Sequence, residues 1–307
     1  MRGFLLSVLS FCLVACICVS ELLAMDKYNE SQKIQIDTDV KDAVMTFMDD
    51  DEVPDGETLL ADGEESIDDL SVPNAVPGTD AEGDSPDATS NPESPSATPN
   101  PMRRKVDFTE LKSINSDVDC WIYVPNTHID YYVMQEQEPE VYYYLWRNIY
   151  QQQSEWGSIF KPAYPNMDTL LDAHQLIFGH HMAYGSVAFS DLMNYHDKSY
   201  AEKWPNIYLY YTDRVERWKV WTAGTVNPYD ALYTVPYELN SADYDNLLSH
   251  LDDIGEYSLR SNRPTKSERT TILSTCDNTN GFRFFIATTW AETYYYDRAD
   301  ARNAMRA

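Results

Sequence analysis

Cysteine and histidine are the residue types that most often supply a nucleophile and its base, and the chain holds 5 cysteines and 6 histidines. Cys276 lies in a strand-like run, TTILSTCDNTNGFRFF, and Arg283 follows it across a turn expected over residues 277–281. Arg283 is therefore expected to return on the neighbouring strand beside the sulfur. A thiol attacks as the thiolate, which a nearby cation or base favours. This segment predicts a candidate nucleophile.

A base for such a thiol would be a histidine on an accessible loop. Only His180 and His181 lie in a glycine-flanked stretch, LIFGHHMAYGS, directly after an apolar strand-like run. The other histidines lie outside such a stretch, at positions 128, 174, 196 and 250. On these residues alone two interpretations remain open for Cys276: a nucleophile served by one of the paired histidines, or a buried and inert thiol.

The cysteine count bears on redox state and on metals. Three cysteines fall in an apolar N-terminal run, which leaves Cys120 and Cys276 in the rest of the chain. These two either form one disulfide or remain free thiols. They have no CxxC partner, and no glycine-rich phosphate loop is present. We expect no metal and no cofactor.

Short strands are the elements that must position these residues. Eight β-type runs with turn signals between them predict a mainly β fold, a barrel or a sandwich. The runs cover residues 120–124, 129–134, 157–160, 175–178, 207–212, 216–226, 270–275 and 282–290. Two helices are expected. One covers residues 107–115, and the other starts at Ser241 and is followed by leucines at helical spacing.

The net charge of −27 argues against nucleic acid or an anionic lipid surface as the main partner. Between Asp49 and Met102 the chain has 16 acidic residues, no Lys or Arg and 8 of its 16 prolines. Such a segment has too little apolar surface to fold, so residues 49–102 are expected to be a disordered, extended linker. Residues 103–307 hold enough apolar and aromatic residues for one domain.

The N-terminus carries an uncharged run from Gly3 to Ser20, preceded by Arg2. Its length suits a transmembrane signal-anchor over residues 1–25, and Arg2 would leave the rest of the chain outside the cell. A cleaved signal peptide and a lipoprotein processed at Cys16 are the alternatives. Residues 26–48 are expected to be a juxtamembrane spacer containing a short helix.

Several ordered motifs together resemble the sortase family, most closely class B. They are L-S-T-C at 273–276 followed by Arg283, G-H-H-M at 179–182, G-S at 185–186 and F-S-D-L at 189–192. Upstream, V-D-C-W-I-Y-V-P at 118–125 and I-D-Y-Y-V-M at 129–134 resemble that family's first two strands. The expected helix near residues 243–256 stands where class B sortases carry an inserted helix. The chain departs from the family pattern at Ile272, Cys120 and Tyr132.

This resemblance implies a closed eight-stranded sortase-type β-barrel and a membrane-anchored, extracellular cysteine transpeptidase. Such an enzyme cleaves the C-terminal sorting signal of surface or pilin proteins and transfers the acyl group to an amine of peptidoglycan or a pilin lysine. Carried over by position, Cys276 is the nucleophile, His180 the acid and base, and Arg283 the oxyanion or substrate-positioning residue. His181 would point to the opposite face of an extended segment. Asp191 and Asp277 are as consistent with solvated turns and receive no role.

Two other classes of protein share part of this pattern. A non-catalytic, surface-displayed binding domain can use the same barrel, since fold alone does not prove activity. A papain-like peptidase has the same nucleophile type, but it places the cysteine before the histidine, whereas here His180 precedes Cys276. The complete set of Cys276, His180 and Arg283 favours the transpeptidase.

Overall fold

The computed structural model describes residues 27–47, 57–60, 100–137, 142–163, 173–182, 186–233, 237–276 and 281–297. The apolar run 3–20 and most of the expected linker lie outside these ranges. Among the helices that are described, none combines the length and the apolar composition needed to cross a bilayer.

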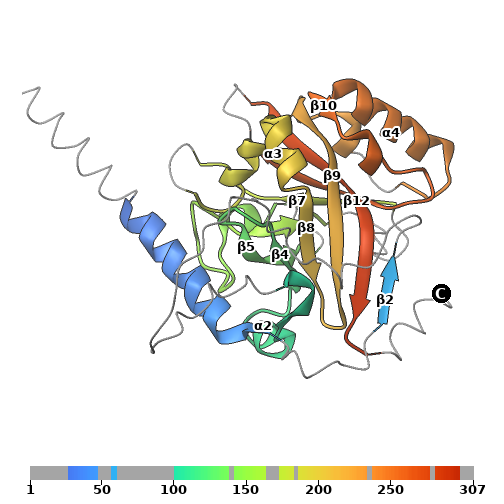
Figure 1. Cartoon of the computed structure of the whole chain (residues 1–307). Helices are drawn as coiled ribbons and strands as arrows, with labels where there is room; N and C mark the ends of the chain where they lie inside the picture. The colour runs from blue at the N-terminus through green and yellow to red at the C-terminus, as the bar shows by residue number, and fades with distance from the viewer. Residues whose placement is uncertain are drawn as a thin grey trace, which may run out of the picture.

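Eight strands form a closed barrel in the order β9-β8-β4-β5-β6-β7-β11-β12, and β12 pairs again with β9 to close the ring. Their bounds are β4 Val118–Tyr123, β5 Asp130–Gln135, β6 Ile159–Lys161, β7 His174–Phe178, β8 Asn206–Tyr210, β9 Arg214–Val226, β11 Thr270–Cys276 and β12 Arg283–Tyr295. Each overlaps one of the eight strand-like runs in the sequence. The predicted closed eight-stranded barrel is therefore confirmed (Figure 1).

In the described ranges, four further strands lie outside this ring. β10 (Tyr257–Ser258) pairs with β9, and β2 (Glu57–Leu60) pairs with β12 at its far end. β1 (Met45–Phe47) pairs with β3 (Arg104–Val106) in a separate two-stranded sheet. β2 falls within residues 49–102, where a linker was expected.

Alternation along the strands separates the inside of the barrel from its outer face. Every barrel strand contributes to one buried cluster, which includes Ile122, Ile177, Leu273 and Ile286. Because all eight strands meet in this cluster, it fills the interior. The residues of opposite parity, such as Phe178, pack in a second cluster with the helices that cover the barrel from outside.

Helices cover the barrel on different sides. α2 (Phe108–Ile114) starts at Asp107, whose carboxylate accepts from the backbone N–H groups of residues 109 and 110. α4 (Ala242–Ile254) starts at Ser241, whose hydroxyl accepts from the N–H of residue 244. Both starts follow from N-capping side chains, and both helices were predicted. The shorter helices are α3 Lys198–Lys203, η2 Pro101–Arg103, η3 Tyr144–Trp146, η4 Ser190–His196, η5 Ala231–Tyr233 and η6 Arg260–Asn262.

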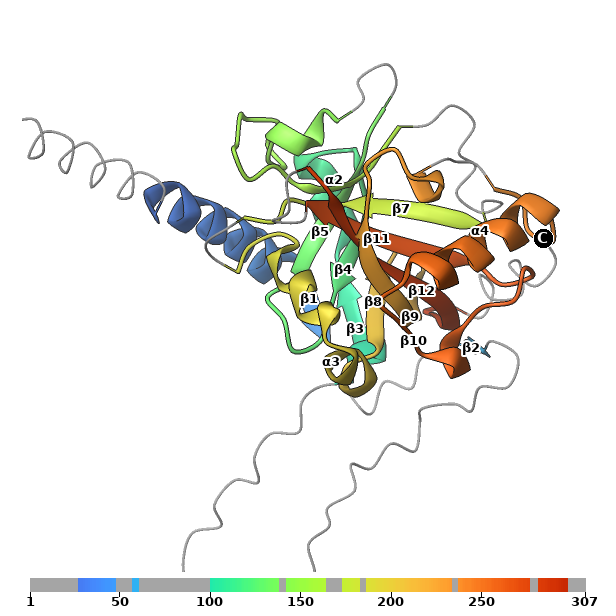
Figure 2. The same cartoon turned by 90° about the horizontal axis from the view of Figure 1, so that it is seen from above.

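Residues 27–44 are helical and pack against the barrel. Val40 and Val44 on this helix are buried in the outer cluster. Both views show the helix and α4 on opposite sides of the barrel (Figures 1 and 2). The segment expected to hold a short helix as a spacer thus contacts the domain through a continuous helical stretch.

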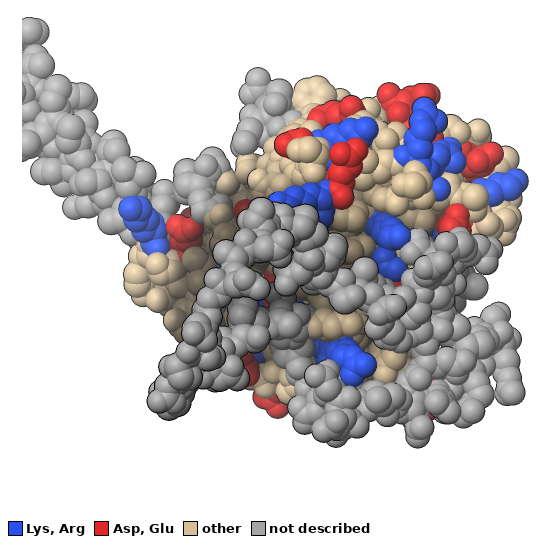
Figure 3. Space-filling view, in the orientation of Figure 1, with Lys and Arg blue, Asp and Glu red and all other residues tan. Residues whose placement is uncertain are grey.

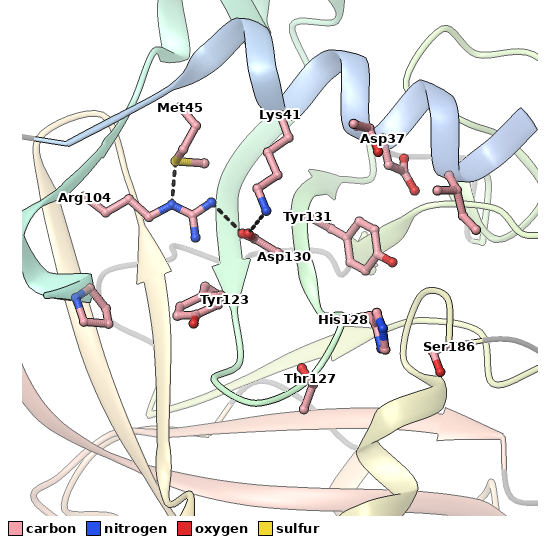
Figure 4. A pocket seen from close by; sticks show the side chains of 13 residues that line it. Asp37, Lys41, Met45, Arg104, Tyr123, Thr127, His128, Asp130, Tyr131 and Ser186 are labelled. Atoms are coloured by element: carbon pink, nitrogen blue, oxygen red, sulfur yellow. Dashed lines mark hydrogen bonds and ion pairs between the residues drawn. The ribbon is translucent and has the colours of Figure 1, made fainter. Parts of the chain in front are cut away.

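Polar contacts also tie this helix to β5. Lys41 forms an ion pair with Asp130, and Arg104 donates to the same carboxylate at 2.6 Å (Figure 4). The pocket between the helix and the barrel has a volume of about 720 Å³. On the face of the molecule in Figure 3, basic and acidic side chains are interspersed over the region of α3 and α4, without one large patch of a single sign.

Candidate active site

Cys276 and Arg283 are neighbours across the β11–β12 ladder. The antiparallel register pairs the two residues directly, and Arg283 Nη1 donates to Cys276 Sγ at 2.6 Å. This is the placement that the spacing of the two residues predicted. Both side chains are partly accessible, at the end of the two strands. A positive charge in contact with the sulfur stabilises a thiolate.

His180 reaches the same end of the barrel from β7. The parallel β7–β11 register pairs Phe178 with Ser274, and Gly179 N donates to Ser274 O at 3.2 Å. His180 and Cys276 each lie two residues beyond that pair, on the same parity and thus on the same outer face. His180 is 8% exposed. The structure therefore brings the sulfur, the guanidinium and one imidazole to a single edge.

The backbone carbonyl of Leu145 fixes the orientation of the imidazole. His180 Nε2 lies 2.8 Å from Leu145 O, and the rings of His180 and Trp146 are 5.0 Å apart. A carbonyl oxygen only accepts, so Nε2 carries the hydrogen, and in the neutral ring the lone pair is on Nδ1. Nδ1 is thus the nitrogen available for proton transfer.

The pKa of His180 lies below its ordinary value. Burial is the main cause, since it disfavours the charged ring, and the hydrogen bond to Leu145 O opposes it. The positive charges of Lys33 and Arg283 lower the pKa further. The resting imidazole is therefore biased toward the neutral form, which can accept a proton.

Leu145 is held in place by its own loop. Glu136 accepts from the backbone N–H groups of Tyr142 and Tyr144, which fixes the turn that leads into η3. Gly157 has φ +54°, and a Cβ on it would lie 2.2 Å from Leu145 O. Only glycine permits this approach. The sequence could not reveal Leu145 as a site residue, because it acts through a backbone carbonyl that any residue type provides.

Aromatic side chains line the outer face next to Cys276. The rings of Phe178 and Tyr233 stack at 5.8 Å, and the Tyr233 hydroxyl is 2.8 Å from Ser274 Oγ. Tyr142, 46% exposed, lies edge-on to the rings of Phe160 and Phe178.

The other cysteine and the two aspartates considered in the sequence are not part of this site in the described residues. Cys120 is free, fully buried in the barrel interior, and burial raises the pKa of its thiol. Cys276 is also free, so the two form no disulfide. Asp191 accepts from the backbone N–H of His128 and lies 2.8 Å from its Nδ1, whereas Asp277 lies outside the described residues. In the described ranges, no group of His, Cys, Asp and Glu is arranged to hold a metal ion.

The chain is similar in sequence and in fold to sortase B proteins of several bacteria. No family model matches the chain. Sortase B of Listeria monocytogenes is 28% identical over 169 residues, which cover 55% of this chain and 66% of that protein. The chain thus spans slightly less than two thirds of the length of that relative.

Solved structures agree with this relation. Clostridium perfringens sortase B has a TM-score of 0.54 and 22% identity, and the match covers 59% of this chain and 98% of that one. A Staphylococcus aureus sortase B–substrate complex has a TM-score of 0.54 and 24% identity, covering 60% and 83% of the two chains. The closed barrel, with its cysteine and arginine at one strand end, has the sortase fold. In sequence the chain is similar to sortase B of Listeria monocytogenes, and its fold is similar to that of solved sortase B structures.

Proposed function

We propose that the chain is a cysteine transpeptidase that cleaves a sorting signal and transfers the acyl group to an amine. The contact between Arg283 Nη1 and Cys276 Sγ, at the barrel end where His180 also lies, is the observation that carries the proposal. A nucleophile, a base with a defined tautomer and a fixed cation are the parts that acyl transfer through a thioester needs.

The first half of the reaction forms the thioacyl enzyme. His180 Nδ1 accepts the proton of the Cys276 thiol, and the thiolate attacks the carbonyl carbon of the scissile peptide bond. Arg283 donates to the carbonyl oxygen as negative charge develops on it. The C–N bond then breaks, the leaving amine takes the proton from His180, and the acyl group remains on the sulfur.

The second half returns the enzyme to its starting state. An acceptor amine attacks the thioester carbonyl and loses a proton to His180. The C–S bond breaks, and the sulfur recovers a proton as the new amide leaves. Transfer exceeds hydrolysis when the amine reaches the thioester before water does.

The proposed partners follow from the resemblance and from the proteins that share the fold. The donor would be a surface or pilin protein with a C-terminal sorting signal, and the acceptor an amine of peptidoglycan or a pilin lysine. Sortase B structures that share this fold include one complexed with a substrate and one complexed with Gly3. The apolar run 3–20 supports a membrane anchor that holds the domain outside the cell.

A transpeptidation assay tests the proposal. The full chain is incubated with a library of sorting-signal peptides and triglycine, and the products are identified by mass spectrometry. We expect a new amide between one peptide and triglycine, with no such product from Cys276→Ala. A chain that binds a peptide but forms no amide would instead support the alternative of a non-catalytic binding domain.

A further inference from the structure

A buried cation on the N-terminal helix lies close to the candidate active site. Lys33, in the helical segment 27–44, is 8% exposed and forms an ion pair with Asp37 at 2.9 Å. Asp37 in turn accepts from the Tyr132 hydroxyl at 3.1 Å. Lysine is almost never buried unless it is paired, because desolvating its charge is costly. Val40, Val44 and Lys41 dock the same helix at other positions along its length.

The ammonium of Lys33 points at the loop that carries Leu145. Lys33 Nζ donates to Gly157 O at 3.3 Å. Gly157 is the residue whose α-carbon is packed against the Leu145 carbonyl, and the next residue, Ser158, donates its N–H to Tyr144 O at 2.9 Å. Lys33 thus contacts the segment at Gly157 and Ser158, which packs against η3.

The same contacts continue to the imidazole. Leu145 O is the partner of His180 Nε2 at 2.8 Å, so an unbroken chain of contacts runs from Lys33 through Gly157 and Leu145 to His180. Among the described residues, the charged groups that act on His180 come from two elements: Lys33 from helix 27–44 and Arg283 from β12. The titratable thiol of Cys276 on β11 lies at the same barrel end.

We propose that Lys33 is a positioning residue for His180: its ammonium holds Gly157 and, through it, the Leu145 carbonyl that orients the ring. The inference rests on the proposed function, in which His180 transfers protons through Nδ1. A cation near the ring disfavours the imidazolium, so Lys33 also helps to keep the resting ring neutral and able to accept the thiol proton. The N-terminal helix is then part of the catalytic unit.

The test uses NMR titration of the His180 ring in full-length chains that also carry Cys276→Ala, with the His180 signal assigned by its loss in His180→Gln. Lys33→Met combined with Asp37→Asn removes both buried charges together, so that neither is left unpaired. Lys33→Gln, also made together with Asp37→Asn, is a smaller change and gives the same comparison if the first double variant is unstable. Lys33→Arg keeps the charge, and Lys41→Met removes an ion pair from the same helix at a site facing Asp130.

We expect the His180 pKa to rise in both double variants, and to stay at its starting value in Lys33→Arg and Lys41→Met. In chains with Cys276 intact, kcat/KM should fall about 10-fold in the double variants, because a displaced catalytic group loses its alignment. An unchanged titration in both double variants overturns the inference. An equal rise in Lys41→Met also overturns it, since helix docking alone would then explain the effect.

The two proposals fail in distinguishable ways. If no chain transfers peptide but the His180 pKa still rises without Lys33, the proposed function fails and the link from Lys33 to His180 holds. If the chain transfers peptide and the Lys33 variants match Lys41→Met in titration and rate, the function holds and the link fails.

Discussion

Of the two adjacent histidines, we expect His180 and not His181 to transfer protons. The Leu145 carbonyl holds Nε2–H of His180 and leaves Nδ1 for proton transfer. We expect His180→Ala to lower kcat/KM by about 10²- to 10⁴-fold, the usual contribution of general acid–base catalysis. His181→Ala should lose little. Comparable rates for the two variants in the peptide transfer assay, or the reverse order, would contradict the assignment.

Arg283 is predicted to act through its shape as well as its charge. The guanidinium is planar and offers five donors, so it can contact the sulfur and a developing oxyanion together. Arg283→Lys keeps the positive charge but loses this fork. We expect a folded protein, by circular dichroism, with kcat lowered by about 10²-fold. Turnover close to that of the unaltered chain would show that only a diffuse positive charge matters.

His174, on β7, has a role in stability. It is fully buried, with Nε2 2.8 Å from Leu232 O, and burial lowers its pKa to about 4. As pH falls, the His174 ring of the unfolded chain therefore binds a proton near pH 6.5, whereas in the folded chain it binds one only near pH 4. His174 does not affect the free energy of unfolding above pH 6.5. Between pH 6.5 and pH 4 its titration lowers the free energy of unfolding by about 3 kcal/mol.

Urea unfolding at pH 7 and pH 4 measures this loss. The matched comparison is His174→Gln, which removes the titrating ring. We expect the unaltered chain to lose more free energy of unfolding between the two pH values than His174→Gln does. Equal losses in the two chains would show that His174 does not contribute to the acid sensitivity.

The helices and strands that depend on local sequence patterns could be predicted. The barrel strands alternate between the interior cluster and the outer cluster, and the eight runs read from the sequence correspond to β4–β9, β11 and β12. α4 has its capping Ser241 and its leucines at helical spacing. Cys276 and Arg283 could be placed together because the sequence predicts a turn between their two strands, and the register pairs them.

Contacts between distant segments could not be predicted in the same way. The Lys33–Gly157 hydrogen bond joins residues 124 positions apart, and neither residue type signals the other. Leu145 acts through its backbone, which has no signature in the sequence. The pairing of β2 with β12 also arises within a composition that favours an extended linker.

The contacts of the helix lead to a prediction for the whole element. Removing residues 27–44 takes away Lys33 and its hydrogen bond to Gly157, together with the Val40 and Val44 packing. We expect this deletion to reduce peptide transfer by at least about 10-fold. The matched control removes residues 61–90, within the expected linker, and should leave transfer of free peptides unchanged. Equal activity of the two deletions would show that helix 27–44 does not contribute to peptide transfer.

For the whole molecule, the pairing of β1 with β3 bears on what the acidic segment 49–102 can do. β1 ends two residues before the segment and β3 begins two residues after it, so both ends of the segment are held at the domain. Its 16 acidic residues and 8 prolines still predict an extended chain. Because helix 27–44 also packs against the barrel, the length of the segment does not set how far the barrel lies from the N-terminal run. Shortening the segment should therefore leave both surface anchoring in cells and the chemistry at Cys276 unchanged.

The central claim is that Cys276 carries the acyl group. The measurement is intact-mass spectrometry of the full chain mixed with a sorting-signal peptide that it cleaves. Peptide mapping then locates the modified residue. We predict a thioacyl adduct on Cys276 that disappears when triglycine is added, is lost in Cys276→Ala and persists in Cys120→Ala, because Cys120 is enclosed in the barrel. An adduct that survives in Cys276→Ala and is lost in Cys120→Ala would contradict the account.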